Sequence, residues 1–206
     1  MTGIQALERT HPTLPMQPRR GGQPGRVERR EFEYERHGTQ TLIGNFEVAT
    51  GKHIAPSIGP TRTEADFAAH IKQTIATDPD AEWVFVTDQL NTHQSEALVR
   101  LVAAHDGLPD DLGVKEKTGV LRSMPTRATF LQDPHHRLRF VYTPKHCSWL
   151  NQIEIWFSIL VRKVLRRASF TSTDDLRARI LAFIDYFNRT MAKPFKWTYK
   201  GRPLVA

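Results

Sequence analysis

The stretch that decides the fold is Trp83-Val84-Phe85-Val86-Thr87-Asp88 (WVFVTD), an unbroken apolar run that ends in an aspartate. The run is rich in β-branched and aromatic residues, Pro79 precedes it, and a polar turn follows it at 89–93. A short apolar run with these flanks is typical of a strand buried on both faces in a parallel sheet. We therefore predict a fully buried, central parallel strand that delivers Asp88 to its carboxyl end.

Strand-like sequence lies upstream of this run. The segment TQTLIGNFEV (39–48) has strand composition, and Gly51 marks a turn into a second such segment at 53–58. These segments predict an antiparallel meander. Downstream, LRFVYT (138–143) predicts another short strand, which Pro144 ends. The stretch 106–137 is polar and irregular, and no element is predicted there.

Helices are predicted between and after the strands. Thr63 and Asp66 have the spacing of a capping box, which predicts a helix over 63–77, and Ser95 is placed to cap a second helix. Two more helices follow residue 150, and Ser172 and Asp175 have capping-box spacing at the start of the second. Their apolar stripes are Ile153, Phe157, Leu160, Val161 and Val164, and Leu176, Ile180, Phe183, Ile184 and Phe187. This order predicts an α/β fold, with helices packed on the faces of a mixed sheet.

Residues 9–30 stand apart in composition. They hold four prolines, three glycines and six arginines. Prolines and glycines at this density break helices and strands alike, so a mobile basic Pro/Gly-rich loop is predicted. The loop either contacts a nucleic-acid backbone or is simply solvated.

Charge is distributed unevenly along the 206 residues, which carry a net charge of +7. Residues 1–150 hold 18 basic and 18 acidic side chains, whereas residues 151–206 hold 11 basic and 4 acidic ones. A basic excess at one end indicates a surface for a polyanion such as nucleic acid, the alternative being a solvated arginine-rich helix.

The single cysteine excludes an internal disulfide. With no signal peptide or apolar span in the sequence, we expect a soluble protein of the cytoplasm that does not bind membranes.

Asp88 is the first candidate for chemistry. Ligands of open α/β sheets bind outside the carboxyl ends of the strands, which places Asp88 well for a metal ion or a substrate. An aspartate after a strand also commonly hydrogen-bonds the following turn. Its position alone favours neither interpretation.

Glu154 is the second candidate. It lies about 100° around the helix from Ile153, at the border of the apolar stripe. A carboxylate among Ile153, Ile155 and Trp156 costs free energy unless it is paired or binds a metal ion. The helix dipole also favours an acid in the first turn, but it does not account for the apolar flanks. We therefore favour a functional role for Glu154.

Asp88 and Glu154 together predict a site for hard cations such as Mg²⁺, which take oxygen ligands. Paired metal ions activate a water or hydroxyl and stabilise the leaving oxygen of a phosphodiester. A basic helix surface nearby would hold the DNA that the acids repel. The residues by themselves therefore predict metal-dependent phosphoryl transfer on nucleic acid.

At these residues the sequence resembles a known family. VFVTDQLNTH (84–93) and YTPKHCSWLNQIEIWF (142–157) resemble the DDE transposases of the mariner superfamily, specifically the bacterial insertion-sequence branch (the IS six-thirty type). That branch has a strand ending in Asp-Asn-x-x-x-His and a Pro-x-x-Ser-x-x-Asn-x-Ile-Glu segment. Here the Pro-to-Ser gap is three residues, and Gln89 replaces the first motif's usual Asn. The residues that support the motifs are Asn91, His93, Pro144, Ser148 and Asn151.

The resemblance extends to 33–51 and 186–197, and it implies a ribonuclease-H-like fold over residues 1–206. It implies that three acids bind two Mg²⁺ or Mn²⁺ ions and catalyse DNA cleavage and transfer at transposon ends. Asp88 matches the second acid and Glu154 the third. The DNA would contact the basic residues near Glu154, and the intact transposase would be a homo-oligomer on the bacterial nucleoid. These basic residues are Lys145, Arg162, Lys163, Arg166 and Arg167.

The first acid of the family precedes the part that matches Thr2 to Leu7, in a segment like Asp-Glu-x-Thr-Gly. This chain begins with Met1 at that point, so we expect that it lacks the start of its first strand. Glu8 lies downstream of the matching position and does not take over the role. With two of three ligands, the chain alone is expected to be inactive or severely impaired. The alternatives are a non-catalytic DNA-binding or oligomerising remnant and a general ribonuclease-H-like nuclease.

Overall fold

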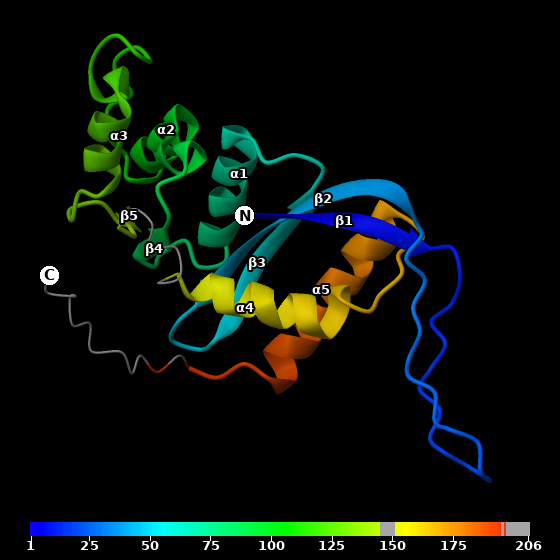
Figure 1. Cartoon of the computed structure of the whole chain (residues 1–206). Helices are drawn as coiled ribbons and strands as arrows, with labels where there is room; N and C mark the ends of the chain where they lie inside the picture. The colour runs from blue at the N-terminus through cyan, green and yellow to red at the C-terminus, as the bar shows by residue number, and fades with distance from the viewer. Residues whose placement is uncertain (145–150, 195, 197–206) are drawn as a thin grey trace, which may run out of the picture.

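The computed structural model describes residues 1–144, 151–194 and 196, which fold as a mixed α/β structure (Figure 1). Strands β1 (Thr2–Arg9), β2 (Tyr34–Glu47) and β3 (Lys52–Gly59) form an antiparallel sheet in that order. Strand β4 (Trp83–Thr87) pairs in parallel with β5 (Leu138–Tyr142) in a second sheet. The predicted meander and the parallel pairing are confirmed, whereas the residue pattern does not indicate β1.

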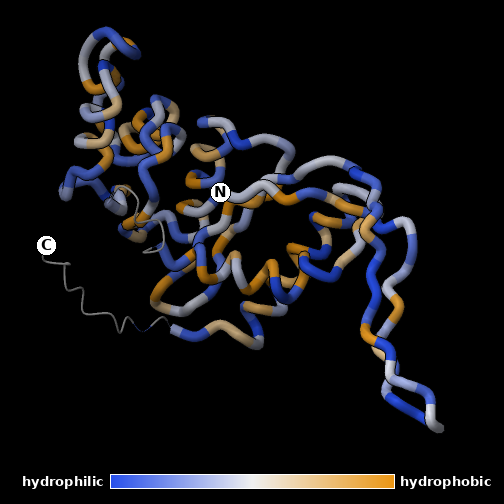
Figure 2. Tube along the Cα trace, viewed as in Figure 1, coloured by the Kyte–Doolittle hydropathy of each residue, from blue (hydrophilic) through white to orange (hydrophobic). Residues whose placement is uncertain are grey.

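Helices cover both faces of the antiparallel sheet. Neighbouring strand residues point to opposite faces, and in β2 Ile43 packs with α1 (Glu64–Ile75) while Leu42 packs with Trp156 on the other side. That other side carries α4 (Gln152–Leu160) and α5 (Thr173–Thr190), and hydrophobic positions gather where these helices face the sheet (Figure 2). The predicted class is confirmed, and the arrangement is compatible with a ribonuclease-H-like fold.

The helices begin where the capping residues predict. Thr63 and Asp66 form a reciprocal capping box at α1, and the Ser95 hydroxyl accepts the Leu98 N–H at the start of α2 (Glu96–His105). Ser172 caps α5 in the same way through the Asp175 N–H. Each of these side chains satisfies a backbone N–H group that would otherwise lack a partner in the first turn. A membrane-spanning helix is not found among the described residues.

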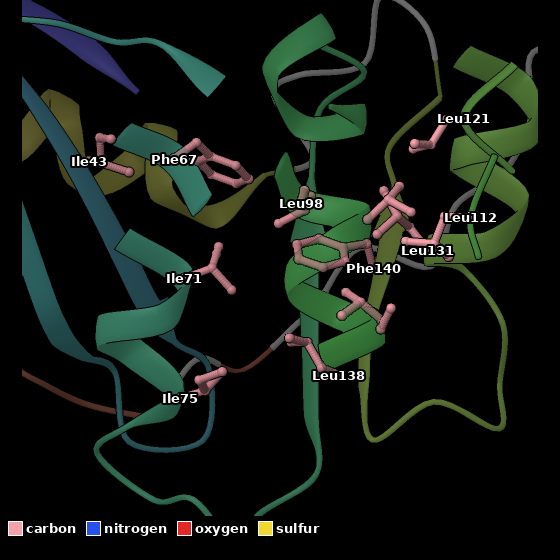
Figure 3. Packing of buried hydrophobic residues seen from close by; sticks show 13 residues of the cluster. Ile43, Phe67, Ile71, Ile75, Leu98, Leu112, Leu121, Leu131, Leu138 and Phe140 are labelled. Carbon is pink, nitrogen blue, oxygen red and sulfur yellow. The ribbon is translucent and has the colours of Figure 1, made fainter. Parts of the chain in front are cut away.

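A helix also forms in the polar stretch 106–137, where the sequence pattern predicts no element. Helix α3 (Met124–Leu131) follows a 3₁₀ turn, η2 (Val120–Arg122), and begins with a capping box between Ser123 and Thr126. The spacing matches a capping box, but Thr replaces the usual Glu or Gln, and the helix has only eight residues. Leu131 packs in one core with Leu98 of α2 and with Phe140 and Leu138 of β5 (Figure 3).

Strand β4 differs from its prediction as a fully buried, central strand. Val84 and Val86 are 48% and 52% exposed, while Phe85 on the opposite face stacks on Phe140 with ring centroids 5.5 Å apart. Among the described residues β4 pairs with β5 alone. The burial prediction is therefore wrong. An apolar run does not reveal whether one or both of its faces will be covered.

The basic segment between β1 and β2 is an extended arm rather than an irregular loop. Three isolated antiparallel bridges hold its two sides together, and it projects away from the body of the molecule (Figure 1). Gly21 and Gly22 turn the chain at its tip with φ angles of 56° and 80°, which glycine adopts at little cost. At its base, Arg9 and Tyr34 are cross-strand partners. We refer to residues 10–33 as the arm; its mobility stays a prediction.

Candidate active site

Asp88 is the first residue after β4, and its carboxylate is held by the turn that follows. The Nδ1 atom of His93 lies 2.7 Å from Asp88 Oδ1, and the Leu90 N–H donates to the same oxygen at 3.2 Å. The Asp88 side chain is 35% exposed. Asp88 therefore bonds the following turn, as one interpretation predicts, and still reaches solvent at the strand end; its role as a ligand stays a prediction.

The surroundings of Asp88 favour its charged form. Burial by itself would raise its pKa, but four interactions together lower it: the hydrogen bond from His93, the charge of His93, the Leu90 N–H and the Met1 amino group. A lowered pKa keeps the carboxyl ionised at neutral pH. An ionised carboxylate is a ligand that divalent cations such as Mg²⁺ accept.

His93 lies inside the protein behind Asp88, in the 3₁₀ turn η1 (Asn91–Gln94). Its side chain is 6% exposed, and its ring lies 4.3 Å from the ring of Phe67. The Tyr142 hydroxyl donates to the His93 carbonyl at 2.8 Å. Asn91 in the same turn is exposed and faces solvent.

A cleft of about 830 Å³ lies beside Asp88. One wall comes from α3, the helix that the sequence pattern does not predict. The lining residues are Asp88, Gln89, Leu90, Gln94, Met124, Pro125, Ala128, Gln132, Tyr142, Thr143 and Pro144. The amide side chain of Gln89 donates to the Thr143 carbonyl at 3.0 Å, which ties the floor of the cleft to the end of β5.

Glu154 lies in the first turn of α4, which Asn151 caps by accepting the Ile153 N–H at 3.4 Å. Its side chain is exposed, as is that of Ile155, whereas Trp156 is buried. The burial cost that favours a role for Glu154 in the sequence argument therefore does not arise, and that step is wrong. Its position at the helix N-terminus remains suited to negative charge.

The start of β1 links the two acids. Burial lowers the pKa of the Met1 amino group, and the charges of Asp88 and Glu154 oppose this shift. The Met1 amino group is therefore within electrostatic range of both carboxylates. Asp88 after β4 and Glu154 in α4 thus both act electrostatically on the start of β1, although they are separated along the chain.

A cluster of three potential metal ligands lies on β1 and β2, away from Asp88 and Glu154. It is the cluster of this kind found among the described residues. Carboxylate oxygens of Glu8 and Glu35 and a ring nitrogen of His37 lie within 4.8 Å of one another. His37 Nε2 and Glu8 Oε2 are 2.6 Å apart, so these two side chains form a hydrogen-bonded pair at the base of the arm. The sequence does not single out this cluster because the cross-strand pairing of Glu8 with Glu35 spans the whole arm.

Basic side chains follow α4 on a π-helical turn, η4 (Val161–Leu165). The Arg30 guanidinium donates to the Arg166 carbonyl at 3.2 Å, which brings the arm to the same surface. The exposed basic residues of this turn and its end, here called the basic patch, are Arg162, Lys163, Arg166 and Arg167. Two other predicted residues, Lys145 and Ser148, lie outside the described residues, and Pro144 lines the cleft.

A family model described as DDE superfamily endonuclease matches residues 9–177 of the chain. The matched range includes Asp88, Glu154, the cleft and the basic patch. Comparisons with curated proteins and with solved structures found no match.

Proposed function

Because the chain belongs to the DDE superfamily endonucleases, we propose that it is the catalytic domain of a transposase that cuts and joins DNA at the ends of an insertion sequence. The observation that carries this proposal is Asp88, an ionised carboxylate at the end of β4 beside a cleft. The spacing of Asp88 with His93 and of Asn151 with Glu154 supports the mariner superfamily and its IS six-thirty branch. Its setting would be the bacterial cytoplasm at the nucleoid, as a homo-oligomer on DNA.

Asp88 and Glu154 would hold Mg²⁺ or Mn²⁺, of which a complete site takes two ions. When bound, the ions activate a water or 3′-hydroxyl and stabilise the leaving oxygen of the phosphodiester. The chain's own residues prepare this site. His93 and the Leu90 N–H keep Asp88 charged, and the first turn of α4 favours the charge on Glu154. The basic patch would hold the DNA backbone.

The complete site of the family has three acids, and within the described residues no third carboxylate joins Asp88 and Glu154 in a compact cluster. We propose the start of β1 as the place for a third acid, because the charges of Asp88 and Glu154 both act on the Met1 amino group there. We therefore propose that the 206-residue chain binds metal weakly and does not cleave DNA by itself. The two-acid site also favours one alternative function, a DNA-binding or oligomerising remnant without catalysis.

Manganese binding tests the proposed ligands without requiring cleavage. Wild-type chain is expected to bind Mn²⁺ in a calorimetric titration, and Asp88→Ala and Glu154→Gln are each expected to raise the Kd at least about tenfold. Removing either carboxylate removes a charged oxygen ligand. Asp111→Ala, which removes an exposed aspartate away from the cleft, is the matched control and should leave the Kd unchanged. Equal Mn²⁺ affinity in all four proteins would refute the assignment.

DNA binding tests the basic patch. Replacing its four basic residues by alanine is expected to weaken binding to a fluorescent 30-base-pair duplex. It should also reduce the slope of log Kd against log salt by about 0.9 for each phosphate that the patch neutralises. The matched control removes the same charge from four exposed basic residues elsewhere, Arg100, Lys115, Lys117 and Arg122.

A control that weakens binding as much as the basic-patch variant would show that the attraction is diffuse rather than centred on this patch. Asp88→Ala, measured without metal, separates DNA binding from metal binding. If that variant binds DNA like the wild type and the wild type binds no Mn²⁺, the non-catalytic remnant is the correct interpretation.

A further inference from the structure

The carboxylate of Asp88 has two oxygens in different surroundings. Two donors reach Oδ1, the His93 ring at 2.7 Å and the Leu90 N–H at 3.2 Å. Among the described residues no hydrogen bond is made to Oδ2, on a side chain that borders the 830 Å³ cleft. The turn therefore binds one oxygen of the carboxylate, whereas the other makes no hydrogen bond to the described residues and is available as a ligand.

The contacts of His93 determine which of its ring nitrogens carries the proton. Nδ1 faces Asp88 Oδ1 and also the Asp88 carbonyl oxygen at 3.2 Å, and both of these atoms only accept hydrogen bonds. Nδ1 must therefore be the donor. Nε2 is buried and has no hydrogen-bond partner within the described part of the chain. These contacts correspond to a ring that carries a proton on Nδ1, since the acceptors that face a ring nitrogen set its role as donor.

The ring and the backbone of His93 are each held by a neighbouring element. The buried ring lies against Phe67 of α1, and Tyr142 of β5 donates to the His93 carbonyl. These contacts restrain both the side chain and the turn that carries it. Restraint of this kind lowers the entropy lost when a hydrogen bond orients its partner.

We propose that His93 is the positioning residue of Asp88: it donates from Nδ1 to Oδ1, fixes the carboxylate and directs Oδ2 at the metal ion. This inference rests on the proposed function for the identity of the ion, but not for the orientation itself. His93 takes no part in proton transfer in this role, because its donating nitrogen is already bound to Asp88 and its other nitrogen is shielded from solvent. Removing the partner of a metal-binding side chain typically changes metal affinity roughly 10- to 100-fold.

The ring tautomer tests the orientation without any metal or DNA. Long-range proton–nitrogen spectra of ¹⁵N-histidine-labelled full chain are expected to show His93 protonated at Nδ1 at pH 7. Asp88→Ala removes the side-chain acceptor, so the Nδ1 resonance of His93 is expected to shift. A wild-type His93 ring without a proton on Nδ1 would overturn the proposal, whatever the chain does with metal ions.

Metal affinity tests the consequence. His93→Phe keeps a ring against Phe67 but removes the donor, and is expected to weaken Mn²⁺ binding about 10-fold or more. His93→Asn can place an N–H near the Nδ1 position, and is expected to recover most of the affinity. His136→Phe is the matched control, because His136 also packs its ring on a phenylalanine, Phe130, in the same half of the molecule.

The pattern across these variants separates positioning from simple structural support. A structural role predicts that His93→Phe lowers the melting temperature, whereas positioning predicts weaker Mn²⁺ binding at an unchanged or higher melting temperature. If Asp88→Ala weakens Mn²⁺ binding and His93→Phe does not, the positioning role is wrong while the proposed function stands. If neither variant nor Glu154→Gln changes Mn²⁺ binding, the metal assignment fails, and the tautomer spectra alone decide the orientation.

Discussion

A chain extended by Asp-Glu directly ahead of Met1 is expected to nick supercoiled plasmid DNA in Mg²⁺ or Mn²⁺ at least about 100-fold faster than the 206-residue chain. The physical reason is the position of Met1, whose amino group lies within electrostatic range of both Asp88 and Glu154. A carboxylate added there would lie within electrostatic range of both existing carboxylates. The magnitude is that of one preorganised charge-stabilising group in an active site. The measurement is the rate of conversion from supercoiled to open-circular plasmid.

Three control proteins test whether the gain in nicking rate comes from the added charge and from the two existing acids. An Asn-Gln extension has the same length and shape without the charge, and should nick no faster than the unextended chain. The Asp-Glu extension combined with Asp88→Ala or with Glu154→Gln should lose the gain, because all three acids are needed together. If the unextended chain nicks DNA as fast as the extended one, a third acid at the start of β1 is unnecessary and that part of the proposal is wrong.

Trp156→Ala is expected to be the most damaging single substitution in the hydrophobic core that α4 and α5 form against the antiparallel sheet, with a loss of about 3–5 kcal/mol in the free energy of unfolding. Trp156 is 1% exposed, its ring lies 3.8 Å from His53, and Phe183 and Phe187 of α5 pack at 6.2 and 6.1 Å. Its removal leaves a cavity between α4, α5 and the antiparallel sheet. A domain of ordinary stability has only about 5–15 kcal/mol in total. Urea unfolding should therefore show a much lower midpoint with an unchanged slope.

The adjacent residue supplies the comparison. Ile155 is 50% exposed on the same turn of α4, and Ile155→Ala is expected to change stability by no more than about 0.5 kcal/mol. The two substitutions together distinguish a buried position from a merely apolar one. Similar losses from both would mean that α4 packs with a different face toward the sheet.

The parts of the fold that can be predicted are those determined by residues close together in the sequence. Thr63 with Asp66 and Ser172 with Asp175 mark helix starts because a cap is formed by residues three apart, and the structure contains both. Strand β1 is not predictable in this way, because the partner that holds it lies on the far side of the arm. Helix α3 escapes prediction because its capping box uses Thr126 and the helix is short.

The candidate site is predictable in its residues but not in its contacts. A strand that ends in Asp88 and a helix that begins near Glu154 can be inferred from sequence patterns. Neither pattern reveals that His93 turns back to bind Asp88 Oδ1, since a five-residue turn can fold in several ways. Nor does it reveal that Glu154 is exposed, because the helix face that is covered depends on α5 and the sheet.

The cross-strand pairing of Arg9 with Tyr34 has an evolutionary consequence. The antiparallel register of β1 and β2 ends at that pair, so the residues between Arg9 and Tyr34 lie outside the sheet. We expect changes of length within 10–33 to leave the register of β1 and β2 and the two hydrophobic cores intact, although they would remove the contact of Arg30 with the Arg166 carbonyl. We therefore expect related proteins to carry arms of different length and charge on the same scaffold, and a two-residue turn in place of the arm to yield a minimal domain.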